Sequence, residues 1–267
     1  MSGKAQFQPG SHKPALIEGP LTALSWLTII PVQGATAFDR ITGARVMVSL
    51  PVVGIFLGAV AAGLRWGFAT LGTNYLLAGV LVVVALQLLT RFMHMDGLAD
   101  VADALGSYAE PAKAREILAD PHAGLIGMGS ALLVLLSQAA AIAVLPWQLV
   151  FFMPVIGRWC TIIGVLEGFK PMKDTGFGAL IVGTVKPWWW AAWLLVIMPA
   201  LWVLGFSWPL VTAAVVLSVL TAVVLAKHCH KRFAGLNGDT CGFILEISST
   251  VFVCVLACFS TFLLPLQ

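Results

Sequence analysis

The residues best suited to chemistry form an acidic stretch, from His94 to Asp103, directly after a long apolar run. If this stretch is helical, Asp96, Asp100 and Asp103 are spaced i, i+4, i+7 and fall on one narrow face. Like charges at this spacing repel each other. A hard divalent cation with oxygen ligands would hold them together. The alternative is a solvated acidic face on a loop helix, which the neighbouring membrane span makes less attractive.

A second loop, residues 227–242, leads from basic residues into a glycine-rich turn around Asp239. Its glycines, Gly238 and Gly242, leave backbone N–H groups free to meet an anion, and Asp239 can reach a metal ion. Glu246, seven residues after Asp239, shares its helix face if the helix begins early. The basic residues Lys227, Lys231 and Arg232 are explained most simply as membrane anchors.

Two other side chains of the first loop have both a structural and a chemical interpretation. His94 is a candidate base, metal ligand or phosphate donor, and otherwise an interfacial polar group. Asp120 precedes a proline, where an aspartate commonly caps a helix, and it is otherwise a further metal ligand.

The composition is that of a polytopic membrane protein. The chain is 60 % hydrophobic and only 10 % charged, with a mean hydropathy of +0.96, whereas about a quarter of a soluble domain is charged. A net charge of +3 does not indicate a nucleic-acid partner. The five cysteines show no paired spacing, so we interpret them as small apolar residues. The polar start lacks the layout of a cleaved signal peptide.

The apolar segments predict an all-α helical bundle that forms one membrane-embedded domain over residues 1–267, with about seven transmembrane helices and short cytoplasmic or interfacial helices. Residues 1–45 form a cytoplasmic or interfacial segment, with a broken apolar helix from Leu16 to Pro31. A further short helix is expected at 112–119. The expected spans are 46–66, 75–93, 125–145, 147–166, 188–206, 208–227 and 243–264.

The charges are distributed unevenly between the two ends of these spans. Thirteen of the fifteen Lys and Arg residues lie in the N-terminal segment and in the loops 91–124, 167–187 and 227–242, and the exceptions are Arg65 and Arg158. By the positive-inside rule this face is cytoplasmic, with the N-terminus inside. The two loops with candidate site residues, 91–124 and 227–242, are therefore expected to share the cytoplasmic face of the membrane.

Carboxylates for a divalent ion, basic residues and glycine-rich turns together favour a phosphate-rich substrate, because a metal ion and Arg or Lys stabilise a transferring phosphoryl group. Alcohol phosphotransferases and prenyltransferases are membrane enzymes of this kind. The CDP-alcohol motif has further spaced aspartates, and the prenyl motif a second Asp-rich segment, that this chain does not reproduce. A divalent-metal transporter would need carboxylates inside the spans, which are nearly free of them.

Taken together, these motifs resemble the cobalamin synthase family, the adenosylcobinamide-GDP ribazoletransferases. The resemblance rests on His94-x-Asp96-Gly97-Leu98-x-Asp100-x-x-Asp103, Arg115-Glu116-Ile117-Leu118-x-Asp120 and Gly238-Asp239-Thr240-x-Gly242 with Glu246. It extends to Leu27-Thr28-x-x-Pro31-Val32 and to Arg158. It implies a Mg²⁺-dependent transferase that joins adenosylcobinamide-GDP to α-ribazole or its 5′-phosphate and releases GMP.

Within this reaction, the charges of the residues predict their roles. Asp96, Asp100 and Asp103 would hold one or two Mg²⁺ ions, and an aspartate or His94 would accept the hydroxyl proton. Further metal candidates are Asp120, Asp239 and Glu246, and candidate substrate contacts are Arg115, Arg158, Lys231, Arg232, Gly238 and Thr240. Besides the two substrates, the lipid bilayer is an expected partner, and a homo-oligomer and other late cobamide-pathway enzymes are candidates.

Overall fold

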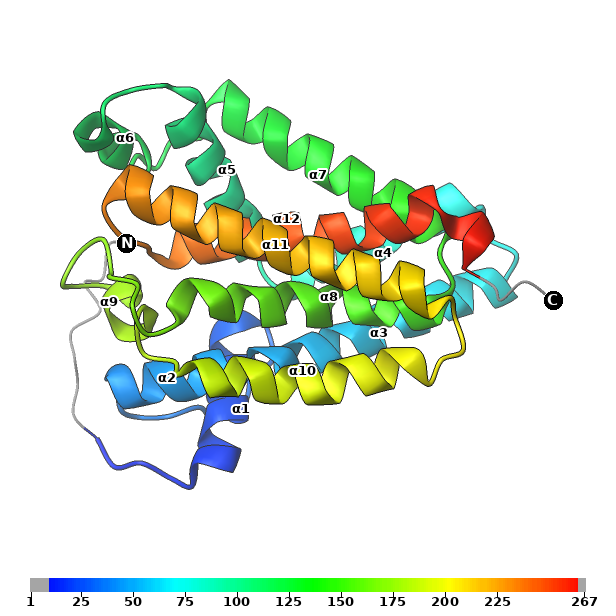
Figure 1. The fold of residues 1–267 in the computed structure, drawn as a ribbon, viewed down its shortest axis with the longest axis horizontal. Helices are drawn as coiled ribbons and strands as arrows, with labels where there is room; N and C mark the ends of the chain where they lie inside the picture. The colour runs from blue at the N-terminus through cyan, green and yellow to red at the C-terminus, as the bar shows by residue number, and fades with distance from the viewer. Residues whose placement is uncertain (1–9, 264–267) are drawn as a thin grey trace.

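The computed structural model describes residues 10–263, and their regular structure consists of α-helices and two short 3-10 helices. Five helices in this part of the chain are long and apolar enough to cross a membrane. They are α3 (Leu50–Thr70), α7 (Leu125–Val144), α8 with the 3-10 helix η1 (Trp147–Val165), α11 (Trp208–Phe233) and α12 (Gly238–Cys258). They lie along the long axis of the molecule (Figure 1), as expected for a polytopic helical bundle.

Two other apolar helices are shorter than the expected spans. Helix α4 (Tyr75–Leu89) is followed after three residues by α5 (Met93–Gly106), and the two are bent by 93° at the break. The break contains Arg91 and Phe92, both with a φ of 56°, a left-handed conformation that is uncommon for residues other than glycine. Helix α10 (Pro187–Trp202) has 16 residues. All seven predicted spans thus coincide with apolar helices, but among residues 10–263 only five reach spanning length alone, and a sixth if α4 and α5 count as one broken span.

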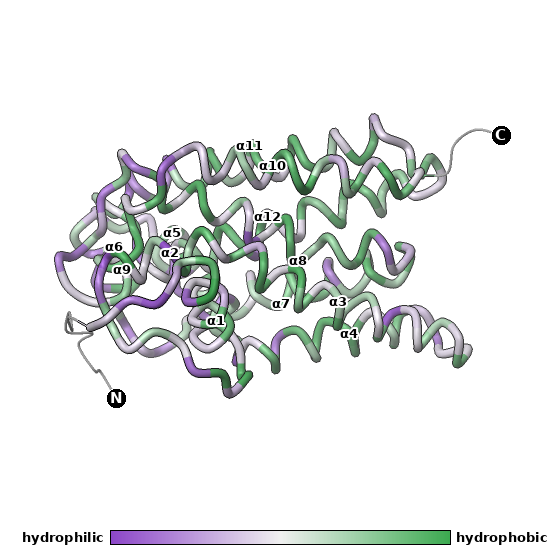
Figure 2. The backbone as a smooth tube through the Cα atoms, turned by 90° about the horizontal axis from the view of Figure 1, so that it is seen from below, coloured by the Kyte–Doolittle hydropathy of each residue, from purple (hydrophilic) through white to green (hydrophobic). Residues whose placement is uncertain are grey.

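Short helices gather at one end of the bundle. They include α1 (Ala15–Leu27), α2 (Arg40–Val48), α6 (Pro111–Ile117) and α9 (Phe177–Ile181), whereas the 3-10 helix η2 (Ser260–Phe262) follows α12. Figure 2 shows that hydrophilic residues gather at the end that holds α2, α5, α6 and α9, whereas the long helices are mostly hydrophobic. We therefore treat α5 as lying outside the membrane-spanning helices. Helices α1 and α6 correspond to the predicted helices at Leu16–Pro31 and 112–119.

Helix α8 is the centre of the bundle. Of an apolar stretch of 18 residues in α8 and η1, 89 % are buried inside the protein, whereas the share in the other four spanning helices is 33–56 %. Small residues allow close packing against α8: a Cβ at Gly54 of α3 would lie 2.7 Å from the Cα atom of Val155. Such small-residue contacts are typical of helices that pack within membranes, where lipid gives no hydrophobic reason for helices to associate.

A buried ion-pair cluster joins α1 to α2 at the polar end. The Glu18 carboxylate, only 3 % exposed, accepts hydrogen bonds from the Arg45 guanidinium and from the backbone N–H of Lys13. The ring of His12 lies 3.3 Å from Glu18 and 3.0 Å from Asp39. Burial raises the pKa of Glu18, but the hydrogen bonds from Arg45, Lys13 and His12 outweigh it, so that the net pKa lies below its usual value.

Candidate active site

Helices α5 and α12 meet at two glycines, and this contact brings the two predicted site loops together. A Cβ at Gly97 would lie 2.7 Å from the Cα and 2.9 Å from the carbonyl oxygen of Asp239. In the other direction, a Cβ at Gly242 would lie 2.9 Å from the carbonyl oxygen of His94. Only glycine permits such an approach of the two backbones. The contact therefore places Asp96, next to Gly97, beside the start of α12.

The start of α12 is fixed by a capping box. The side-chain oxygen of Asn237 accepts from the N–H of Thr240 at 3.0 Å, and the Thr240 hydroxyl accepts from the N–H of Asn237 at 2.9 Å. The Asn237 amide also donates to a carboxylate oxygen of Asp239 at 2.6 Å, which orients this side chain. Thr240 is fully buried. Its hydroxyl has a structural role in the cap, and the structure does not place it in a position to bind substrate.

The acidic side chains of the two helices influence one another. Burial, the largest cause, and the charges of Asp96, Asp239 and Asp103, in that order of importance, together raise the pKa of Asp100 to about 7. Asp96 is exposed, and Asp100 and Asp239 are partly buried. The structure therefore places Asp96, Asp100 and Asp103 near Asp239, whereas Asp120 of the same loop lies apart from them. A group of carboxylates that repel each other attracts a cation.

Asp103 differs from the other aspartates because both of its oxygens already have partners. They accept hydrogen bonds from the backbone N–H groups of Gly124 at 2.6 Å and Gly127 at 2.8 Å. These N–H groups belong to the first turn of α7, where no intrahelical acceptor exists. Asp103 thus serves as a distant N-terminal cap for α7.

The donor set fits Mg²⁺ better than a fully protein-bound metal ion. In residues 10–263, no group of three or more His, Cys, Asp or Glu side chains is arranged to hold an ion by itself. Mg²⁺ does not need such a cage, because it usually takes one or two carboxylates and completes its shell with water and substrate phosphate. Asp96 and Asp100, with hard oxygen atoms one helical turn apart, can supply those carboxylates.

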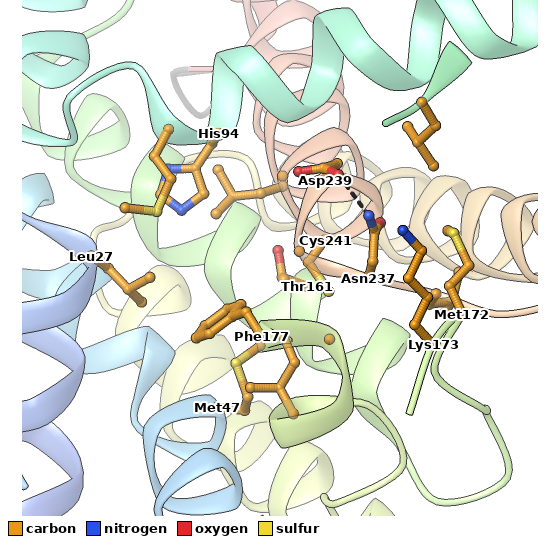
Figure 3. A pocket seen from close by; sticks show the side chains of 18 of the residues that line it. Leu27, Met47, His94, Thr161, Met172, Lys173, Phe177, Asn237, Asp239 and Cys241 are labelled. Atoms are coloured by element: carbon orange, nitrogen blue, oxygen red, sulfur yellow. Dashed lines mark hydrogen bonds between the residues drawn. The ribbon is translucent and has the colours of Figure 1, made fainter. Parts of the chain in front are cut away.

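A cavity of about 380 Å³ opens beside this acidic group. Its wall includes Asp239 and Asn237 from the start of α12, Lys173 from the loop before α9, and Arg115 from α6. Figure 3 shows Asp239, Asn237 and Lys173 toward one side of the cavity and Leu27 on the opposite side. A cavity with two cationic side chains beside carboxylates is suited to a phosphate ester whose charge is shared between Lys or Arg and a metal ion.

His94 lines the same cavity from the first turn of α5. Its side chain is only 8 % exposed, and its Nδ1 atom is buried without a hydrogen-bond partner. Burial, the larger cause, and the positive charge of Arg158 together lower the pKa of His94 to about 3. The imidazole is therefore neutral and has unused hydrogen-bonding capacity.

Two other predicted site residues form a separate buried group inside the bundle. Glu246 accepts a hydrogen bond from Gln138 at 2.9 Å and lies 3.5 Å from the Gln87 amide. Glu246 and Arg158 are 5 % and 4 % exposed, and both line a small cavity of about 20 Å³ that is distinct from the 380 Å³ cavity. The structure does not bring them together with the aspartates. The spacing of Glu246 from Asp239 is helical, but seven residues carry it deeper into the bundle.

The remaining predicted residues lie around the polar end. Arg115 and Gly238 line the cavity. Arg232, in the last turn of α11, donates a hydrogen bond to the carbonyl oxygen of Ala109, and Lys231 beside it is exposed. Asp120 is exposed and accepts from the backbone N–H of His122 at 2.9 Å. Of these residues, Lys231, Arg232 and Asp120 are not part of the cavity wall.

Sequence reasoning missed one wall of the cavity, which comes from residues 172–178. The segment is held by a bridge between Pro171 and Leu236 and by the bond from the Met172 N–H to the Leu236 carbonyl at 2.9 Å. It contributes Lys173 and Phe177 to the cavity. The only signal in the sequence was that residues 167–187 form one of the charged loops on the same face.

The chain is similar to known proteins over nearly its whole length. The family model described as Cobalamin-5-phosphate synthase matches residues 19–257. A relative from Corynebacterium diphtheriae, named adenosylcobinamide-GDP ribazoletransferase, is 48 % identical over 267 residues, which cover 96 % of this chain and 97 % of the relative. Proteins of the same name from Corynebacterium efficiens and Roseiflexus sp. are 49 % and 30 % identical, with 94 % and 86 % of this chain and 95 % and 85 % of those proteins covered. No solved structure gives a significant match.

Proposed function

Because the chain belongs to the cobalamin-5-phosphate synthase family, we propose that it joins adenosylcobinamide-GDP to α-ribazole, or to α-ribazole 5′-phosphate, and releases GMP. Membership makes the chain a transferase of cobalamin biosynthesis. The observation that best supports the substrates is the contact of α5 with α12, which sets Asp96 and Asp100 beside Asp239 at the edge of a cavity with Lys173 and Arg115.

The reaction is a displacement at phosphorus. A ribose hydroxyl oxygen of α-ribazole forms a bond to the phosphorus that carries the cobinamide, and the bond from this phosphorus to the bridging oxygen breaks. GMP leaves with the electron pair. Asp239 lines the cavity with one carboxylate oxygen held by Asn237. We assign Asp239 as the acceptor of the hydroxyl proton, because it is the aspartate in the cavity wall.

Asp96 and Asp100 are assigned to hold Mg²⁺. When bound, the ion supplies charge neutralisation at the pyrophosphate and at the departing GMP. Lys173 and Arg115 complete the positive charge around the phosphates. Arg115 offers a planar fork of donors that suits two phosphate oxygens, whereas Lys173 acts as a point charge.

We also propose that the site faces the cytoplasm from a bacterial inner membrane. The polar end that holds the cavity is formed by segments that carry most of the Lys and Arg residues (Figure 2), which supports this orientation through the positive-inside rule. Both substrates would then reach the site from the cytoplasm.

The test is a reconstituted assay with purified protein in detergent, adenosylcobinamide-GDP, α-ribazole and a Mg²⁺ titration. Asp96→Ala and Asp239→Ala should lower turnover by at least about 10²-fold, as removal of a group that acts only in the transition state does. Asp120→Ala is the matched control, because this aspartate is exposed and outside the cavity. Complementation of a bacterium that lacks its cobalamin synthase gives an independent measure. Wild-type protein that is folded but forms no product would refute the proposed reaction.

A further inference from the structure

The two proposed substrates differ greatly in size and polarity, and the cavity can enclose only one of them. Its volume of about 380 Å³ is at the lower end of the range of roughly 300–1,000 Å³ for small-molecule sites. A nucleoside fits this space. A corrin ring with its amide side chains and an adenosyl group is much larger than a nucleoside, and it must remain outside.

The cavity wall is apolar on one side and polar on the other. The apolar side includes Leu27 from α1, Met47 from α2 and Phe177 from α9 (Figure 3). The polar side includes Asp239 and Lys173. Flexible thioethers and an aromatic ring pack well against a flat apolar ring system. A ligand with an apolar aromatic base at one end and a polar or charged sugar at the other matches this division.

One polar group stands out in the otherwise apolar surroundings of the base. His94 is nine-tenths buried and lines the cavity; its Nδ1 is fully buried, and neither Nδ1 nor Nε2 has a hydrogen-bond partner among the described residues. A buried polar atom without a partner costs free energy, and such atoms are therefore rare unless a ligand or water completes them. The base of α-ribazole, a benzimidazole with two methyl groups, has one ring nitrogen that is free to accept a hydrogen bond.

We propose that this cavity is the subsite for α-ribazole, with the dimethylbenzimidazole against Leu27, Met47 and Phe177, its free ring nitrogen on His94, and its ribose toward Asp239 and Lys173. The proposal rests on the proposed function for the identity of the two substrates. It assigns the apolar contacts of the lower base to α1, α2 and α9, outside the loops 91–124 and 227–242, and the hydrogen bond of the base to His94 of α5. The corrinoid then approaches from the open side, where its phosphorus meets the ribose hydroxyl.

The competing occupant is the guanosine of adenosylcobinamide-GDP, which is also a nucleoside. Guanine carries several donors and acceptors around its edge, and each one loses free energy when buried without a partner. Figure 3 labels two polar side chains on this part of the wall, His94 and Thr161, and the Thr161 hydroxyl already donates to the Gly157 carbonyl at 2.9 Å. His94 is left to donate one hydrogen bond to a base, which suffices for one acceptor but not for the edge of guanine. Dimethylbenzimidazole needs only one hydrogen-bond donor, for its free ring nitrogen.

The first test uses Met47→Phe, which enlarges a side chain at the apolar end. We expect the KM for α-ribazole to rise by about tenfold, the scale of a misfit of one or two methyl groups in an apolar pocket. The KM of Met47→Phe for the riboside of unsubstituted benzimidazole, which lacks both methyl groups, should rise less. The KM for adenosylcobinamide-GDP should stay within twofold of wild type. Met128→Phe, on the exposed face of α7, is the matched control and should change neither KM.

The second test pairs His94→Phe with an α-ribazole analogue in which carbon replaces the free ring nitrogen. Wild-type protein should lose about tenfold in kcat/KM on the analogue, as for one lost hydrogen bond. His94→Phe should lose activity on α-ribazole but show no further loss on the analogue. If His94 only supports the fold, the variant will still prefer α-ribazole over the analogue as wild type does, and the assignment of this histidine is then wrong.

The outcomes separate this proposal from the proposed function. If Met47→Phe raises the KM for adenosylcobinamide-GDP and leaves that for α-ribazole unchanged, the cavity holds guanosine and the subsite proposal is overturned, although the reaction stands. If wild-type protein turns over neither substrate, the proposed function fails first. Direct titration of purified protein with α-ribazole alone then decides whether the cavity binds this nucleoside: tight binding in wild type and weakened binding in Met47→Phe supports the subsite, and equal binding in both refutes it.

Discussion

Gly97→Ala is the substitution that tests most directly how the acidic site is assembled. An added Cβ would lie 2.7 Å from the Cα of Asp239, about 0.7 Å closer than the 3.4 Å at which ordinary contact begins. The nearest atoms are backbone, so no side chain can rotate away. Helices α5 and α12 must therefore move apart, and Asp96 moves with α5 away from Asp239.

The expected effects on stability and turnover follow from this displacement. Forcing an extra carbon into a packed contact costs about 1–3 kcal/mol, partly offset by about 1 kcal/mol from the better helix propensity of alanine. The loss of stability should therefore be small. Turnover is more sensitive, because a misplacement of about 1 Å between reacting groups can cost about 10²-fold. We expect turnover to fall by about 10–10²-fold and the Mg²⁺ concentration for half-maximal activity to rise.

The assay compares the turnover, Mg²⁺ dependence and melting temperature of Gly97→Ala with those of two other variants. Gly129→Ala, on α7, is the matched control because nothing lies within 4 Å of its added Cβ. Gly242→Ala should have a smaller effect than Gly97→Ala, because its added Cβ lies 2.9 Å from the nearest atom of α5. If Gly97→Ala keeps the activity and Mg²⁺ dependence of Gly129→Ala, the close contact does not position the carboxylates, and this reasoning is refuted.

Three further predictions concern groups around the site. Asp103→Ala should lower the free energy of unfolding by about 0.5–2 kcal/mol, as for a lost helix cap. Asp103→Asn should keep the Mg²⁺ dependence of wild-type activity, and a changed Mg²⁺ dependence would show that this aspartate binds the ion. Glu246→Ala should lower the melting temperature, because it leaves the buried Gln138 amide without the carboxylate that it bonds to and removes the negative charge that shares a small cavity with Arg158, a change that costs roughly 1–3 kcal/mol. A normal melting temperature would show that this buried group does not depend on the carboxylate. The lowered pKa of Glu18 predicts a stabilising contribution that is present above pH 4.5, its usual value, and is lost as the pH falls below it. The hydrogen-exchange protection factors of α1, which correct for the intrinsic pH dependence of exchange, should fall on acidification, and should fall less in Arg45→Ala.

The sequence predicted the membrane bundle and the meeting of its two acidic loops for clear physical reasons. Long apolar runs have few alternatives to spanning helices, and their length and charge asymmetry also predict that loops 91–124 and 227–242 share one face. The side of the cavity formed by residues 172–178 had no comparable pattern. Its place depends on a bridge between Pro171 and Leu236, a long-range contact that no local periodicity encodes.

Three details of the acidic loop could not be predicted for a related reason. The break between α4 and α5 occurs at Arg91 and Phe92, with no glycine or proline to mark it. Asp103 shares a helix face with Asp96, yet its oxygens bond to N–H groups more than twenty residues away. Glu246 has the right spacing from the site but lies too deep in the bundle. In each case the local sequence allows more than one conformation or bonding partner, and contacts with distant parts of the chain determine which one forms.

The carboxylates of helix α5 repel each other, so other contacts must hold the helix in place. Carboxylates that raise the pKa of Asp100 also repel each other, so the helix needs fixed contacts that do not depend on charge neutralisation. It has three: Gly97 against α12, Asp103 on the first turn of α7, and the Arg232 guanidinium on the Ala109 carbonyl after its C-terminus. A rigid acidic face suits an ion that demands near-ideal ligand geometry. In the proposed site the phosphates would bind to long side chains such as Lys173, which can adjust to the substrate and therefore need no comparable anchoring.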